Sequence, residues 1–343
     1  MRYSRFTLSI VFTTIFTLTR GEVQNDTKSI RKVSRHRRIA NGFPTDRYHY
    51  PYIVSIQNIY GSHGCAGSII SEKFILTAGH CADRPDAPSM VIMVGEPFQN
   101  DYPNQYYPVE EVFRHESYGL PGDLADAIND ISLVKLKEPI KFSRIAQKVK
   151  LIRRDQYVVI GANAVALGWG AVREPQNDND YTYNPAIDTQ DSPLVFDRYR
   201  FDNGSSADAR VFPKNLQCVS QTVISREECL ARYQDPVHES HMCTFLPGRG
   251  PCFKDSGGPL IVDGILVGVL SGGKRCETYP GYPSLWTNVA LFRDWIDSKM
   301  RDSVSHPREA KPPPRTVTNN HVTSSSWAFS HHYFEQRDHT WSG

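Results

Sequence analysis

The sequence predicts an all-β protein, because short apolar runs recur between turn residues along most of the chain. These runs are rich in β-branched and aromatic residues, and clusters of Gly, Pro and Asn separate them. They fall into two sets, one at 52–56, 68–70, 74–77 and 131–134 and one at 219–224, 260–262 and 265–270. Many short strands with frequent turn signals are typical of a β-sandwich or barrel.

One helix is expected near the end of the strand-rich region. Val289, Phe292, Trp295 and Ile296 recur at helical spacing, which predicts an amphipathic helix over Val289–Met300. A chain of 343 residues can bury a large core in one or two domains. The 39 Lys and Arg nearly balance the 37 Asp and Glu, so the charge argues neither for nucleic acid nor for an acidic partner, and no nucleic-acid partner is expected.

The first residues are interpreted as a secretory signal peptide over 1–21. Arg2 and Arg5 precede an apolar run from Phe6 to Leu18, which is too short for a comfortable membrane span. The alternative is a buried strand or helix at the start of the fold. No later segment is apolar for long enough to cross a bilayer, so the expected product is secreted, extracellular and not membrane-bound.

Residues 22–38 form a polar, increasingly basic segment that ends in Arg35-His36-Arg37-Arg38. Such a segment buries too little apolar surface to fold alone. It is either a solvated arm or a pro-segment that ends at a cleavable bond between Arg38 and Ile39.

Two further stretches depart from the strand pattern. Residues 171–214 are rich in Asp, Asn, Tyr and Pro, which predicts a long inserted surface loop; the alternative is a specificity or partner-binding loop. Residues 301–343 combine a triple proline with a Ser run and predict a disordered tail. Asn25 and Asn203 begin possible glycan-acceptor triplets.

Three separate motifs carry the residue types that acyl transfer to serine requires. These are a hydroxyl, a base and a group that orients the base. Ser256 lies in Cys-Phe-Lys-Asp-Ser-Gly-Gly-Pro-Leu, His80 lies in Leu-Thr-Ala-Gly-His-Cys, and Asp130 precedes the apolar run at 131–134. Each residue alone also fits a structural role: a core histidine or metal ligand, or a turn residue. The three motifs together make chance improbable.

With these motifs, residues 39 to about 300 resemble the trypsin/chymotrypsin family of serine proteases. The order His, Asp, Ser matches that family and differs from the α/β-hydrolase order. Gly168-Trp169-Gly170 and Ser271-Gly272-Gly273 are supporting matches. The resemblance implies two packed six-stranded antiparallel β-barrels with a C-terminal helix. It also implies His80 as general base, Asp130 as its orienting group and Ser256 as nucleophile.

The resemblance also sorts the seven cysteines and implies a zymogen. It pairs Cys65 with Cys81, Cys229 with Cys243 and Cys252 with Cys276. Cys218 is left over, because its usual partner position holds Thr45; it is a free thiol or an intermolecular link. Cleavage after Arg38 would free the ammonium of Ile39, which would pair with Asp255.

Two positions depart from the family pattern. Lys254 replaces a glycine whose N–H, with that of Ser256, forms the oxyanion hole, and a side chain there adds strain. Gly250 stands where trypsin carries the aspartate that binds Arg or Lys. Together with the pocket residues Ser271, Gly273 and Ser284, this predicts a preference for uncharged substrate residues, because a buried substrate cation would be unpaired.

The sequence therefore predicts a secreted serine endopeptidase (a hydrolase). The alternative is a non-catalytic homologue that binds a protein partner because of Lys254. A lipase or esterase is a distant third interpretation. The expected partners are a protein or peptide substrate, an activating protease and a protein inhibitor. No cofactor is expected, and too few carboxylates follow Glu96 to predict a calcium site.

Overall fold

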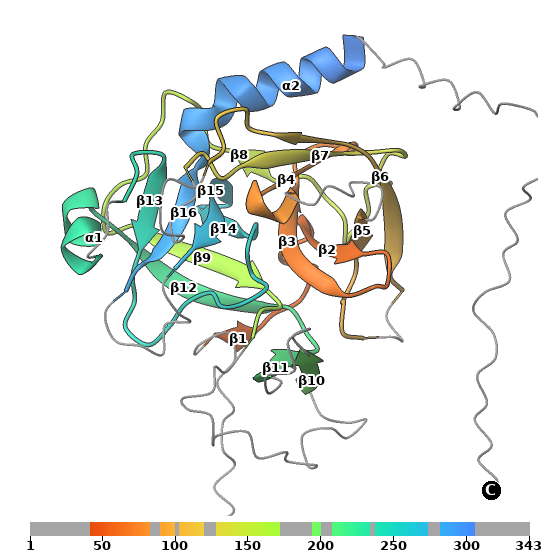
Figure 1. The fold of residues 1–343 in the computed structure, drawn as a ribbon, viewed down its shortest axis with the longest axis horizontal. Helices are drawn as coiled ribbons and strands as arrows, with labels where there is room; N and C mark the ends of the chain where they lie inside the picture. The colour runs from red at the N-terminus through yellow and green to blue at the C-terminus, as the bar shows by residue number, and fades with distance from the viewer. Residues whose placement is uncertain are drawn as a thin grey trace, which may run out of the picture. The chain divides into compact units, whose positions relative to one another are not determined.

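The computed structural model describes the strand-rich part of the chain and the C-terminal helix (Figure 1). The described residues are 42–82, 90–99, 103–119, 128–171, 194–199, 208–233, 237–273 and 282–305. The expected signal peptide, the basic pro-segment and nearly all of the C-terminal tail lie outside them.

The first barrel is a closed ring of six antiparallel strands in the order β2-β3-β4-β7-β6-β5. Its strands are β2 Ile53–Asn58, β3 His63–Ile69, β4 Phe74–Thr77, β5 Met90–Val94, β6 Gln105–Arg114 and β7 Ser132–Leu136. All residues of β4 and β7 are buried, because most of them are apolar or β-branched and both faces of these strands are covered. Between β4 and β5, a short 3-10 turn, η1 (His80–Ala82), carries the predicted base.

The second barrel also closes with six antiparallel strands, because β12 pairs with both β13 and β9. Its strands are β9 Asn163–Gly168, β12 Gln217–Ile224, β13 His241–Thr244, β14 Pro259–Val262, β15 Ile265–Gly272 and β16 Ser284–Asn288. Two-residue strands β1 (Phe43–Pro44) and β8 (Lys150–Leu151) extend this sheet. The prediction of two six-stranded barrels is confirmed.

The helix α1 (Arg226–Arg232) was not expected from the sequence. Its N-cap is Ser225, whose hydroxyl accepts a hydrogen bond from the Glu228 N–H at 3.1 Å. A serine followed three residues later by glutamate is the signature of a capping box, so the signal was present.

The C-terminal helix is confirmed, but its predicted bounds are wrong at both ends. Asn288 caps a 3-10 turn, η3 (Val289–Phe292), by accepting from the Ala290 N–H at 3.2 Å. The α-helix α2 then runs over Arg293–Ser305, beyond the predicted boundary at residue 300. Its last turn packs on the first barrel, where the Lys135 ammonium donates to the Ser303 carbonyl at 3.4 Å.

Within residues 171–214, predicted as a long inserted surface loop, the structure describes two strands. Strands β10 (Leu194–Tyr199) and β11 (Asp208–Pro213) pair as an antiparallel ribbon. In the register of this ribbon, Val195 lies opposite Phe212 and Phe196 lies opposite Val211.

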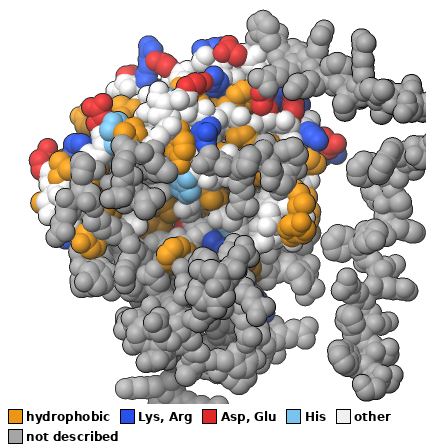
Figure 2. Space-filling view, in the orientation of Figure 1, with side chains coloured by type: hydrophobic (Ala, Val, Ile, Leu, Met, Phe, Trp, Pro, Cys, Tyr) orange, Lys and Arg blue, Asp and Glu red, His pale blue; other side chains and the backbone are white. Residues whose placement is uncertain are grey.

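Side chains of both charges reach the surface of the described residues (Figure 2). On the face shown in Figure 2, basic and acidic side chains are interspersed. Among the described residues, no helix is both long enough and apolar enough to span a membrane.

Candidate active site

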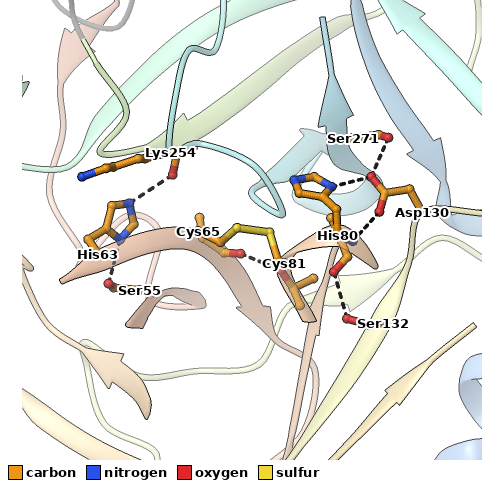
Figure 3. Close-up of a disulfide and its surroundings, with 12 residues drawn as sticks. Ser55, His63, Cys65, His80, Cys81, Asp130, Ser132, Lys254 and Ser271 are labelled. Carbon is orange, nitrogen blue, oxygen red and sulfur yellow. Dashed lines mark hydrogen bonds and ion pairs between the residues drawn. A yellow bond between two sulfur atoms is a disulfide. The ribbon is translucent and has the colours of Figure 1, made fainter. Parts of the chain in front are cut away.

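Asp130 holds His80 through both of its carboxylate oxygens (Figure 3). The His80 backbone N–H donates to Oδ1 at 2.8 Å, and the ring Nδ1 donates to Oδ2 at 2.8 Å. His80 begins η1 shortly after β4, and Asp130 lies just before β7, which pairs with β4. The two residues meet because their strands are neighbours. With Nδ1–H engaged, the other ring nitrogen, Nε2, is left to act as a base.

Two hydroxyl groups of the second barrel donate hydrogen bonds to Asp130. Asp130 is fully buried. The Ser271 hydroxyl donates to its Oδ2 at 2.6 Å, and the Thr287 hydroxyl donates to its backbone carbonyl at 2.7 Å. Ser271 lies on β15 and Thr287 on β16, so the orienting carboxylate is set by both barrels. Ser271, expected only as a pocket residue, therefore also orients Asp130.

Ser256 lies on a tight turn that packs against the first barrel. Gly257 has φ +77°, and a Cβ there would lie 2.4 Å from the Ala66 carbonyl oxygen and 2.1 Å from the Thr77 hydroxyl. Only glycine allows this close approach. The Ala66 N–H also donates to the Ser256 carbonyl at 2.8 Å. The Ser256 turn is thus held against β3 and β4, the strands that lead to His80.

The Cys65–Cys81 disulfide connects the segment that carries His80 with the strand that supports the Ser256 turn. Cys81 follows His80, and Cys65 precedes Ala66, whose N–H binds the Ser256 carbonyl. Among the described residues, the Ser256 hydroxyl makes no hydrogen bond to the His80 ring. Such catalytic hydrogen bonds are often long in free enzymes and tighten when substrate binds.

Lys254 adopts the left-handed conformation expected of the glycine that it replaces, with φ 73°. Its carbonyl accepts a hydrogen bond from His63 Nε2 at 3.0 Å, and His63 Nδ1 lies 2.8 Å from the Ser55 hydroxyl. Burial is the main cause that lowers the pKa of His63 to about 3, so the ring is neutral, with a single N–H for Lys254. Lys254 was the reason to consider a non-catalytic binding module. The residue nevertheless adopts the left-handed conformation that a glycine would adopt in this turn.

Asp255 is buried beside two glycines of the Gly-Trp-Gly motif. Its carboxylate accepts from the Gly170 N–H at 2.6 Å and the Cys252 N–H at 2.9 Å. A Cβ on Gly168 or Gly170 would lie 2.0 or 2.3 Å from this carboxyl group, so both positions exclude larger residues. Burial raises the pKa of Asp255 to about 7.

The predicted pocket residues belong to the second barrel and its loops. Gly250 and Ser284 are buried, whereas Gly273 is exposed. A chain of hydrogen bonds leads to the residue before Gly250 and was not anticipated from the sequence. Trp286 Nε1 donates to the Thr244 hydroxyl at 2.8 Å, that hydroxyl donates to Gln221, and Gln221 donates to the Arg249 carbonyl at 3.1 Å.

The described residues contain two of the three expected disulfides and one cysteine of the third. Cys65–Cys81 and Cys229–Cys243 are disulfides. Cys252 is also disulfide-bonded, and its expected partner, Cys276, lies outside the described residues. Cys218 is a free, half-buried thiol that is hydrogen-bonded to Thr45. Arg38 and Ile39 of the expected activation site lie outside the described residues as well.

A buried carboxylate, Glu96, joins the two barrels. Its Oε2 accepts from Trp169 Nε1 at 2.7 Å and from the Leu216 N–H at 3.0 Å. Burial raises the pKa of Glu96 to about 7. The only cluster with metal-ligand potential among the described residues contains Cys65, His80 and Cys81, and its two sulfurs are already joined in the disulfide.

The two closed barrels have the chymotrypsin-type fold, and the His80–Asp130 pair and the Ser256 turn lie where the barrels meet. The trypsin family model matches residues 39–195 and 198–296. The chain belongs to the trypsin family of serine proteases.

Individual relatives agree with this assignment. The chain is 30% identical over 262 residues to hypodermin-B of Hypoderma lineatum, and the alignment covers 76% of this chain and 86% of that relative. It is 29% identical over 264 residues to trypsin alpha of Drosophila melanogaster, and the alignment covers 76% of this chain and 87% of that relative. The structure of neuropsin, a serine protease of mouse brain, superimposes with a TM-score of 0.59 at 22% identity, covering 76% of this chain and 98% of neuropsin. At that identity, the likeness shows the fold alone.

Proposed function

We propose that this chain is a secreted serine endopeptidase that is made as a zymogen and acts through His80, Asp130 and Ser256. The observation that carries the proposal is the double hydrogen bond from His80 to the buried Asp130, opposite a serine turn packed on the same barrel. A backbone N–H and a ring N–H on one carboxylate leave the imidazole a single orientation, as a general base requires.

The reaction would follow the acyl-enzyme route. His80 Nε2 takes the proton of the Ser256 hydroxyl while its oxygen attacks the peptide carbonyl carbon. The N–H groups of Lys254 and Ser256 bind the resulting oxyanion, which the φ of 73° at Lys254 supports. The imidazolium then protonates the leaving amine, and water, activated by the same base, hydrolyses the acyl-enzyme.

Activation would follow cleavage between Arg38 and Ile39. The support is the state of Asp255: its carboxylate is buried and accepts only backbone N–H groups among the described residues. A buried carboxylate without a cation is unfavourable, and an incoming Ile39 ammonium would supply the missing charge. Replacing Arg38 by Gln should block processing; unchanged processing would reject this cleavage site.

The preferred substrate residue is uncharged in this proposal, because Gly250 places no carboxylate at its position in the pocket. A panel of peptides that differ only in the residue before the cleaved bond tests this. Cleavage after Phe, Leu or Ala should exceed cleavage after Arg; a strong preference for Arg would refute the pocket interpretation.

A fluorophosphonate probe tests the central claim, because it reacts only with an activated serine. The processed protein should be labelled, and Ser256→Ala and His80→Ala should not. Absence of labelling in a processed, folded protein would contradict the proposal and favour a non-catalytic binding module.

A further inference from the structure

The turn that would form the oxyanion hole is strained at one residue. Lys254 has φ 73°, a conformation that costs a non-glycine residue about 1–2 kcal/mol relative to the ordinary right-handed region. Rotation of the Phe253–Lys254 peptide would relieve that strain and turn the Lys254 N–H away. The structure must therefore contain contacts that hold this residue in place.

Backbone contacts hold the turn on both sides of Lys254. The Ala171 N–H donates to the Phe253 carbonyl at 2.9 Å, which sets the orientation of the peptide that carries the Lys254 N–H. On the other side, His63 Nε2 donates to the Lys254 carbonyl at 3.0 Å. In Figure 3, the Lys254 carbonyl points toward His63, and its side chain extends away from His80.

The side chain of Lys254 is held as well, by a residue of the inserted segment. The Lys254 ammonium lies 4.5 Å from the centre of the Phe212 ring. Phe212 is 1% exposed and lies near the end of β11. It packs with Ala171 and Cys252 in a small cluster, and its ring lies 5.6 Å from that of Phe98.

The aromatic contacts continue from Phe212 back to the other support of Lys254. The Phe98 ring lies 5.7 Å from the His63 ring at 77°. Phe212, Phe98 and His63 thus form a row, and Lys254 contacts both ends of it: its ammonium lies over Phe212 and its carbonyl accepts from His63. Ala171 at the start of the inserted segment bonds to the turn, and Phe212 near the end of the segment lies against the Lys254 ammonium.

We propose that Phe212 is a positioning residue for catalysis: by holding the Lys254 ammonium on its ring, it keeps the left-handed turn that presents the oxyanion-hole N–H. The proposal rests on the serine-protease function proposed above. In this chain a lysine replaces the turn glycine, and the inserted segment supplies the aromatic ring against which the lysine ammonium packs.

A double-mutant cycle between Phe212 and Lys254 tests the coupling, with processed protein and a peptide substrate. Phe212→Leu should lower kcat about 3- to 30-fold with KM nearly unchanged, because the cation–π contact is lost and the oxyanion hole acts only in the transition state. Phe212→Tyr and Phe212→Trp keep the ring and should stay within about twofold. In a Lys254→Gly background, Phe212→Leu should change kcat less than about twofold, because glycine adopts the turn unaided.

Phe74→Leu is the matched control. Phe74 is a buried aromatic residue, 3% exposed, that packs beside Phe113 in the first barrel. Its replacement should leave kcat unchanged even where it lowers the unfolding midpoint, which separates a catalytic effect from a general loss of packing.

The following results decide the inference and the proposed function. Equal losses from Phe212→Leu in the parent protein and in the Lys254→Gly background would overturn the inference, as would no loss in either. If neither the wild type nor Lys254→Gly hydrolyses substrate or binds the probe, the proposed function fails. A crystal structure of Phe212→Leu then still decides the inference: a change of φ at residue 254 to a negative value supports it, and an unchanged turn overturns it.

Discussion

The buried carboxylate of Asp255 makes the stability of this fold depend on pH, and this dependence can be measured. Its carboxylate is 1% exposed and accepts hydrogen bonds from two backbone N–H groups. Burial raises its pKa from 3.8 to about 7. A shift of this size corresponds to about 4 kcal/mol between the protonated and ionised forms.

The sign of the effect on stability follows from proton binding. Between pH 4 and pH 7 the unfolded chain has lost the Asp255 proton and the folded chain has kept it. The folded state therefore binds more protons, and the free energy of unfolding decreases as pH rises through this range. We expect full-length Ser256→Ala protein to lose up to about 4 kcal/mol from this group between pH 4 and pH 8.

Cleavage at Arg38–Ile39 should remove most of that loss, because an ammonium beside Asp255 would favour the ionised form. Urea unfolding, followed by tryptophan fluorescence across pH 4–8, compares full-length and cleaved Ser256→Ala protein after N-terminal sequencing of the cut form. Glu96 contributes equally to both forms and cancels in their difference. With Asp255→Asn, the free energies of unfolding of the full-length and cleaved forms should vary with pH in parallel. Parallel pH profiles with Asp255 intact would refute the reasoning.

Three further predictions concern other parts of the structure. Thr45→Cys should form a disulfide with Cys218, which contacts Thr45 beside the pairing of β1 with β12, and should stabilise the fold by about 2–4 kcal/mol; a thiol titration that still finds Cys218 free would contradict this. Asp130→Asn should lower kcat about 10⁴-fold, the size of loss known for this exchange in Ser-His-Asp proteases, while the unfolding midpoint changes little; near-normal turnover would exclude Asp130 as the orienting group. Glu96→Gln should flatten the pH dependence of stability between pH 4.5 and pH 7 by up to about 3 kcal/mol, because the raised pKa of Glu96 makes its ionisation unfavourable in the folded state; urea midpoints at pH 5 and pH 8 that shift as in the parent protein would exclude this account.

The strands and the site residues differ in how far local sequence predicts them. The run at 74–77 coincides with β4 because four consecutive apolar or β-branched residues between turns have few alternatives. The ribbon of β10 and β11 was missed, since its apolar runs are short and lie within a polar segment. The helix α1 was missed although Ser225 and Glu228 carry its capping signature.

The residues proposed for catalysis can be singled out from the sequence, whereas the residues that support them cannot. His80, Asp130 and Ser256 have distinctive neighbours along the chain, so each could be singled out. Nothing adjacent to His63 indicates that its ring binds the Lys254 carbonyl, 191 residues later. Likewise, the glycines at 168 and 170 are explained only by the carboxylate of Asp255, which fills the space beside them.

From its sequence alone, this protein can be assigned an all-β fold, a family and three residues proposed for its chemistry, because patterns of a few adjacent residues encode strands and motifs. Only the tertiary structure shows that Lys254 keeps a left-handed turn and that Phe212 lies beneath its ammonium. The reason is physical: strain is a property of one residue, but the contacts that offset it come from segments that meet only when the barrels close.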